Sequence, residues 1–153
     1  MVLYYTFQQK TKIFAESLGQ VLNQPVYGLE SELNGKHIFM FMLHALASCF
    51  TKKTYPVLNM PESLPNEIFI CSPVWGGGFA APVRYFLENA DLQDTTVNVL
   101  LTADIPAEKY KKNALEFLQK LPCKLGEAYI FATSDKIDPE SDVIMEQLRE
   151  MME

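Results

Sequence analysis

One stretch of the chain combines its only tryptophan with three consecutive glycines. The stretch is Pro73-Val74-Trp75-Gly76-Gly77-Gly78-Phe79, between the apolar run 68–71 and the helical pattern 82–87. Glycine lets a backbone approach a flat ligand closely, and an indole ring gives that ligand a broad apolar face. These residues therefore predict either a binding loop for a planar ligand or a plain strand-to-helix turn with a half-buried tryptophan.

The sequence lacks the motifs of three well-known kinds of domain in which strands and helices alternate. A P-loop needs GxxxxGKS/T after a strand, which the chain lacks. A dinucleotide-binding fold has its glycines at the first strand-to-helix turn, whereas here the consecutive glycines come far along the chain, after the apolar run 68–71. The receiver domain of a response regulator needs acidic residues where this chain has Tyr5-Thr6 and Ser72. All three assignments are excluded.

Composition restricts both the size of the fold and its partners. A chain of 153 residues is large enough for one domain, 1–153, whose core needs neither disulfides nor a metal. Its net charge of −6 argues against a nucleic acid or an acidic membrane as partner, because both attract basic surfaces. The apolar segment 38–50, interrupted by His44 and Ser48, is too short to span a membrane.

The three cysteines and two histidines show no metal-ligand spacing. Cys49, Cys71 and Cys123 include no CxxC pair and lie in apolar or helical surroundings. We expect them to be free thiols in a reducing cytoplasm. No nucleophile, metal cluster or acid–base pair is visible either, so a hydrolytic reaction is disfavoured.

The segments that position these residues alternate between strand and helix. Apolar runs predict the strands, and apolar residues at helical spacing predict the helices between them. The expected strands are 2–5, 24–29, 67–72, 96–101 and 125–132; the expected helices are 11–22, 36–53, one with Phe79 to Ala90 on its apolar stripe, one from Pro106 and one capped by Asp138-Pro139. This alternation predicts an α/β fold: a doubly wound, five-stranded parallel sheet with helices on both faces.

The glycine-rich stretch and the helix after it resemble a known family. Ser72-Pro-Val-Trp-Gly, followed by Ala81-Pro82-Val83-Arg84 and Phe86-Leu87, is similar to the loop and helix of short-chain flavodoxins that hold the isoalloxazine ring of FMN. The resemblance implies the strand order 2-1-3-4-5, in which the loops 6–11 and 73–79 converge at the ligand-binding edge. The residues that it implies for ring binding are Pro73, Val74, Trp75, Gly76, Gly77 and Gly78.

The first loop, residues 6–11, stands where flavodoxins have a phosphate loop of the form Ser/Thr-x-Thr-Gly-Asn-Thr. Thr6 and Thr11 match that pattern, whereas Gln8, Gln9 and Lys10 replace its Thr, Gly and Asn. Gln9 lacks the conformational freedom of glycine, but Lys10 adds a positive charge where the phosphate dianion would lie. Two alternatives stay open: a phosphate site built from hydroxyls, helix dipole and Lys10, or a turn that no longer binds phosphate.

The loop Thr102-Ala103-Asp104 stands where short flavodoxins pass the edge of the flavin. Thr102 and Ala103 are small enough for that place. Asp104 beside a flavin would disfavour the anionic reduced ring by charge repulsion. The same aspartate could equally cap the next helix, and the sequence leaves both roles open.

The expected helix 36–53 is apolar nearly all round. One stripe must pack on the sheet, and the rest needs cover from the proline-containing segment 54–66, from a second subunit in a homodimer, or from an apolar ligand.

The resemblance implies an FMN-binding protein that transfers electrons to a redox partner protein, or reduces a small-molecule acceptor, in the cytoplasm. The cofactor would carry the redox chemistry while the protein sets its potential and access. The alternative is an interaction protein with the same fold that has lost FMN, which the altered first loop would explain.

Overall fold

The computed structural model describes residues 1–35, 40, 42–43, 46–47, 54–133 and 142–152. Its strands are β1 (Val2–Tyr4), β2 (Val26–Gly28), β3 (Glu67–Trp75), β4 (Gly78–Phe79), β5 (Thr96–Ala103) and β6 (Lys124–Ala132). Its helices are α1 (Lys10–Leu22), the short 3-10 helix η1 (Glu32–Gly35), α3 (Ala81–Asn89), α4 (Glu108–Leu118) and α5 (Asp142–Met152).

The main sheet is parallel and runs in the order β2-β1-β3-β5-β6, while β4 pairs antiparallel with β3 alone. Without the two-residue β4, this order is the predicted 2-1-3-4-5, which is therefore confirmed. Because the five strands are parallel, the loops that follow β1, β3, β5 and β6 lie at one edge of the sheet. That edge is where ligands bind in open α/β sheets.

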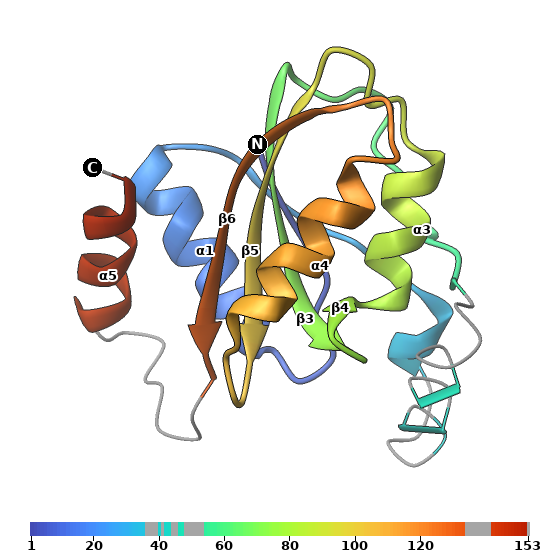
Figure 1. Ribbon diagram of the computed structural model, residues 1–153, viewed down its shortest axis with the longest axis horizontal. Helices are drawn as coiled ribbons and strands as arrows, with labels where there is room; N and C mark the ends of the chain where they lie inside the picture. The colour runs from blue at the N-terminus through green and yellow to red at the C-terminus, as the bar shows by residue number, and fades with distance from the viewer. Residues whose placement is uncertain (36–39, 41, 44–45, 48–53, 134–141, 153) are drawn as a thin grey trace.

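Helices cover both faces of the sheet, as predicted. Figure 1 shows α1 and α5 on one side and α3 and α4 on the other. The alternation of side chains along β3 divides the core accordingly. Ile68 and Ile70 pack with residues of α3 and α4, whereas Phe69 and Cys71 pack with residues of α1 and α5.

The glycine-rich stretch is a tight β-hairpin, which corrects the predicted end of the third strand at residue 72. β3 continues to Trp75, and the register pairs Val74 with Phe79 and Trp75 with Gly78. The two residues of the turn, Gly76 and Gly77, have φ of 60° and 87°. A two-residue turn with both φ values positive suits the twist of a hairpin, and glycine adopts these angles at no steric cost.

The end of this hairpin is attached to β3 through Ser72. The buried hydroxyl of Ser72 accepts a hydrogen bond from the backbone N–H of Ala80, at 3.0 Å, just before α3 begins. Phe79, expected on the apolar stripe of the helix, belongs instead to β4, and its ring packs edge-on against Phe117 of α4 at 5.7 Å. The helix therefore starts later than predicted, at Ala81.

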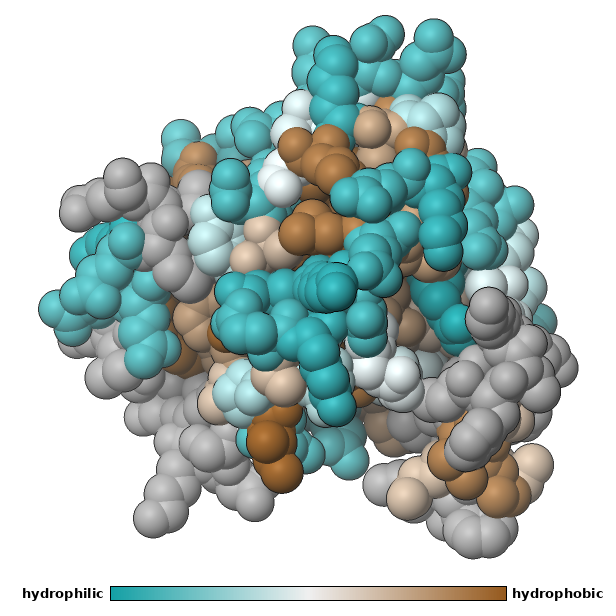
Figure 2. Space-filling view, viewed as in Figure 1, coloured by the Kyte–Doolittle hydropathy of each residue, from teal (hydrophilic) through white to brown (hydrophobic). Residues whose placement is uncertain are grey.

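Most of the predicted helix 36–53, and the predicted cap at Asp138-Pro139, lie outside the described residues. Four hydrophobic residues described within the first segment have helical conformation and are 47% to 63% exposed: Met40, Met42, Leu43 and Leu46. They form part of the hydrophobic cluster at the lower right of Figure 2. No described helix combines the length and the hydropathy that a membrane span requires.

The segment 54–66 is an ordered connection. Val57 forms a bridge with Ser31, and the Asn59 side chain donates to the carbonyl of Gly28 at 2.8 Å. The Oδ1 atom of Asn59 accepts a hydrogen bond from the backbone N–H of Glu30 at 2.7 Å. These contacts hold the segment beside β2.

A buried asparagine connects three strands. Asn98 of β5 donates to Glu67 Oε1 at 3.0 Å and accepts from the N–H of Glu127 at 2.9 Å, where the pairing of β5 with β6 shifts register. A Cβ on Gly126 would collide with the Asn98 side chain. Glycine is therefore required at position 126, because the Asn98 side chain lies so close to the backbone there. A larger residue would displace the Asn98 amide from its partners Glu67 and Glu127.

We expect Gly126→Ala to lower the free energy of unfolding by about 1–3 kcal/mol, the cost of leaving a buried polar group unsatisfied. Gly78→Ala is the control, because a Cβ there would meet no atom within 4 Å. Urea denaturation of both variants measures the difference. Equal transition midpoints for the two would show that the Asn98 contacts contribute little.

Helix α1 begins with a strained residue. Its N-cap, Gln9, has φ 65° and ψ −12° and makes no side-chain capping hydrogen bond. The left-handed conformation costs a residue other than glycine about 1–2 kcal/mol. Gln9 thus adopts the conformation that glycine would provide at this position, at a cost to stability.

Gln9→Gly should raise the free energy of unfolding by about 0.5–1 kcal/mol, because relief of the strain exceeds the added entropy of the unfolded chain. Gln8→Gly is the matched control: Gln8 is not among the residues with positive φ, so this change should destabilise the protein. Chemical denaturation is again the measurement. A Gln9→Gly variant less stable than the parent would contradict the strain assigned to Gln9.

Candidate functional site

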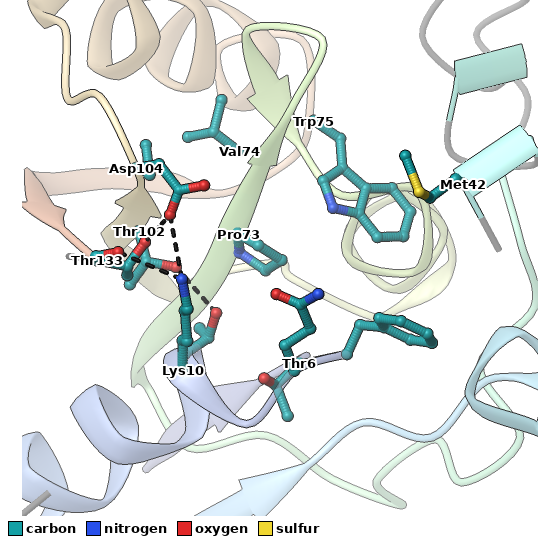
Figure 3. Close-up of a pocket in the computed structure, with 13 residues that line it drawn as sticks. Thr6, Lys10, Met42, Pro73, Val74, Trp75, Thr102, Asp104 and Thr133 are labelled. Atoms are coloured by element: carbon teal, nitrogen blue, oxygen red, sulfur yellow. Dashed lines mark hydrogen bonds and ion pairs between the residues drawn. The ribbon is translucent and has the colours of Figure 1, made fainter. Parts of the chain in front are cut away.

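A cleft of about 230 Å³ lies at the carboxyl edge of the sheet. It is lined by the loop after β1 and the first turn of α1, by the carboxyl ends of β3 and β5, by the residues that follow β5 and β6, and by one residue of the segment 36–53 (Figure 3). Thr102 and Ala103, which were expected in a loop, are the last two residues of β5. The predicted site residues that line it are Thr6, Gln8, Lys10, Thr11, Pro73, Val74, Trp75, Thr102, Ala103 and Asp104. Segments far apart in the sequence therefore meet where the strand order predicts.

The other predicted site residues are not in the cleft lining. Gln9 serves as the N-cap of α1. Gly76, Gly77 and Gly78 form the tip of the hairpin, where the carbonyl of Gly77 accepts a hydrogen bond from the Asn113 side chain at 2.8 Å. A Cβ on Gly77 would meet Asn113 and Tyr110, so the tip faces α4.

Trp75 forms one end of the cleft. Figure 3 shows its ring facing Met42, with Pro73 between this end and Lys10. The ring of Tyr5 meets the indole edge-on at 5.7 Å and an interplanar angle of 89°. Tyr5 is fully buried, and its hydroxyl has no hydrogen-bond partner in the described part of the chain. Burial raises the pKa of Tyr5, so the ring that supports Trp75 is neutral.

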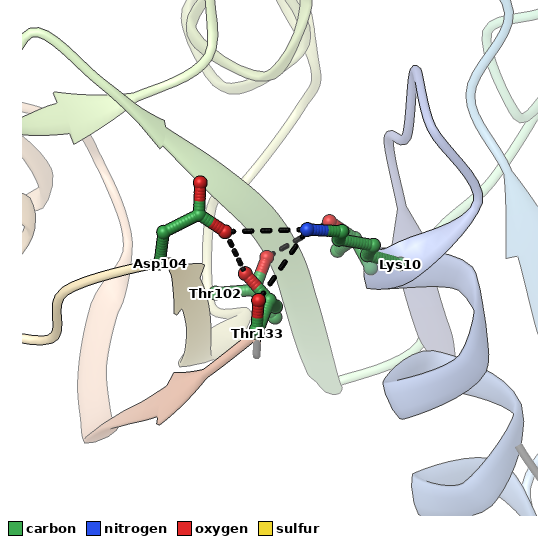
Figure 4. Close-up of polar contacts among 5 residues, drawn as sticks. Lys10, Thr102, Asp104 and Thr133 are labelled. Atoms are coloured by element: carbon green, nitrogen blue, oxygen red, sulfur yellow. Dashed lines mark hydrogen bonds and ion pairs between the residues drawn. The ribbon is translucent and has the colours of Figure 1, made fainter. Parts of the chain in front are cut away.

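A polar cluster forms the other end of the cleft (Figure 4). Lys10 Nζ lies 3.3 Å from Asp104 Oδ1 and 3.4 Å from the carbonyl oxygen of Thr133. The Thr133 hydroxyl donates to Asp104 Oδ1 at 2.8 Å, and the hydroxyls of Thr11 and Thr102 share a hydrogen bond of 2.9 Å. Hydrogen bonds from Thr133 and Lys10 hold the pKa of Asp104 below its usual range. Asp104 is therefore ionised near neutral pH.

The position of Asp104 excludes one of its two expected roles. Helix α4 has Ala107 as its N-cap and makes no side-chain capping hydrogen bond. The capping alternative is wrong, because the Asp104 carboxylate instead pairs with Lys10. The ion pair joins residues 94 positions apart in the sequence.

The N-terminus of α1 opens at this polar end. The first intrahelical bond runs from the N–H of Ile13 to the carbonyl of Gln9 at 3.2 Å. The preceding N–H groups of the first turn have no acceptor within the helix, and Gln9 gives no side-chain cap. Lys10 and Thr11 of this turn line the cleft. An anionic group fits here, while a flat apolar group fits at Trp75.

Three lining residues were missed by sequence reasoning: Phe7, Met42 and Thr133. Phe7 lies within the loop 6–11 that was assigned to the site. Thr133 directly follows β6, so the rule that ligands bind at carboxyl ends of strands could have found it. Met42 gave no comparable signal, because its segment showed apolar residues on every side.

Comparison with known proteins identifies structures of the same fold. No protein-family model matches the chain, and no curated protein matches it in sequence. A candidate flavoprotein from Bacteroides uniformis is similar in structure, with a TM-score of 0.77 at 15% identity over 97% of this chain and 96% of that one. A flavoprotein from Lactobacillus acidophilus, solved in complex with FMN, has a TM-score of 0.66 at 18% identity over 84% and 90% of the two chains.

A flavodoxin is similar as well. Oxidised flavodoxin 2 from Bacillus cereus has a TM-score of 0.56 at 18% identity, over 98% of this chain and 92% of that one. At these identities the likeness establishes the architecture. Together with the strand order β2-β1-β3-β5-β6, it shows that this chain has the flavodoxin-like α/β fold.

Proposed function

We propose that this protein binds FMN in the cleft and acts in electron transfer or in the reduction of a small acceptor. The observation that carries the proposal is the pairing of an aromatic end at Trp75 with a helix N-terminus at Lys10 and Thr11, where the N-cap Gln9 makes no side-chain capping hydrogen bond. A phosphorylated flavin has the same two parts, a flat ring and a dianion. The FMN complex of the Lactobacillus acidophilus protein, which shares the fold, supports this choice of ligand.

The residues present fit FMN at both ends. Pro73, Val74 and Trp75 would hold the ring, and Ala103 would leave room at its edge. Thr6, Gln8, Lys10 and Thr11 would contact the phosphate together with the first-turn N–H groups of α1. Bound FMN supplies the redox chemistry, and the protein provides position and electrostatic surroundings.

An interaction protein that has lost FMN is the second candidate. The Lys10–Asp104 ion pair favours it, because a lysine paired with a carboxylate offers less attraction to a phosphate. Under the first proposal, the partner is a redox protein or a small molecule. A homodimer through the segment 36–53 stays part of the proposal, as does a cytoplasmic setting in which Cys71 and Cys123 are free thiols.

A first test is the absorption spectrum of the purified protein and its titration with FMN. We expect yellow protein with visible flavin bands, or thermal stabilisation on adding FMN, which amounts to about 2.7 kcal/mol at a hundred times Kd. Trp75→Ala should weaken the binding of FMN and riboflavin equally, by roughly the 1–3 kcal/mol of a stacked ring, and Trp75→Phe should restore most of it. Colourless protein whose melting ignores FMN would favour the second candidate.

A second test compares two lysines on the first turn of α1. Lys10 lines the cleft, whereas Lys12 pairs with Glu16 at 3.7 Å and is absent from the lining. Lys10→Ala should weaken FMN binding about tenfold, the loss of one charge-assisted contact, and Lys12→Ala should change it little. Fluorescence titration measures both affinities. Equal curves for the two variants would mean that hydroxyl and N–H groups alone hold the phosphate.

A further inference from the structure

The charges of the described residues that line the cleft cancel. Among the described lining residues, Lys10 and Asp104 are the charged ones, and they pair with each other at 3.3 Å. A phosphate dianion entering the cleft would meet the Asp104 carboxylate beside the lysine that should attract it. Within the described part of the chain, the helix N-terminus is then the main positive feature at this end.

The Asp104 carboxylate is held in place although its side chain is 79% exposed. The N–H of Thr133 bonds to the carbonyl of Ala103 at 2.9 Å, which continues the pairing of β5 with β6 to the position before Asp104. The Thr133 hydroxyl then donates to Asp104 Oδ1 at 2.8 Å. The carboxylate therefore faces Lys10 from a position fixed by the sheet.

We propose that Asp104 determines the flavin specificity of the cleft by competing with the ligand phosphate for Lys10. The inference rests on the proposed function and refines it: the cleft takes FMN and the unphosphorylated riboflavin with similar affinity. Both flavins carry the same ring, which would bind at the Trp75 end of the cleft. The phosphate adds little to binding, because its attraction to Lys10 and the helix N-terminus is offset by repulsion from Asp104.

The test is the ratio of riboflavin Kd to FMN Kd in the parent protein and in Asp104→Asn. Asparagine keeps the shape of the side chain and an oxygen that can accept from Thr133, so the fold is retained. We expect FMN to bind roughly three- to tenfold more tightly at low salt, a gain limited by the exposure of the site. Riboflavin affinity should stay within about twofold of the parent value, since riboflavin lacks the charge that Asp104 repels.

Three comparisons test whether this effect is local to the Lys10–Asp104 pair. Glu108→Gln removes a carboxylate near the start of α4 that pairs with Lys111 at 2.8 Å and does not line the cleft. It should leave both affinities unchanged. In a Lys10→Ala background, Asp104→Asn should improve FMN binding less than in the parent, because the lysine it would release is absent. Raising the salt should shrink the gain, since exposed charges are screened.

The outcomes separate this inference from the proposed function. An unchanged Kd ratio in Asp104→Asn, with flavin still bound, overturns the inference and leaves the proposed function standing. Equal tightening of both flavins also overturns it. A parent protein that binds neither flavin, with an Asp104→Asn variant that binds FMN, supports the role of Asp104 while the proposed function fails for the parent. If neither protein binds either flavin, both proposals fail.

Discussion

The position of β3 between β1 and β5 is the constraint on which the rest of the molecule depends. Residues 68–72 of β3 are buried, and helices cover both of its faces. Burial of each large apolar side chain contributes about 1.5–3 kcal/mol, so the centre of the sheet has little freedom to shift register. With β3 fixed, Trp75 at its carboxyl end must lie between the loops that leave β1 and β5. The two ends of the cleft follow from that arrangement.

Much of the fold could be predicted because its signals are local. Apolar runs and helical spacing indicated the alternation of strands and helices, and the resemblance around Ser72 and Trp75 supplied the strand order. The hairpin could not be read in the same way, since adjacent glycines suit an open loop and a tight turn equally well. The pairing of Trp75 with Gly78 and of Val74 with Phe79 distinguishes the two.

The candidate site was predictable by segment and less so by side chain. The carboxyl-end rule located the segments 6–11 and 102–104, but it does not say which of their side chains meet. Lys10 and Asp104 were assigned separate roles, although β6 and Thr133 bring them together. Asp104 also appeared suited to capping, because the sequence does not reveal that α4 begins only at Glu108. Contacts between distant residues, such as the Lys10–Asp104 ion pair, depend on the spacing of neighbouring strands.

The hydrogen bond from Asn113 to the Gly77 carbonyl has a consequence for the kinetics of ligand exchange. It attaches the hairpin tip to α4, so Trp75 stands on a strand that is tethered at its turn and buried at its base. A wall built this way is preorganised: the hairpin does not need to fold around an incoming ring, so binding against it costs little ordering entropy. Ligand exchange against this wall should then be governed by desolvation and stacking, without opening of the hairpin.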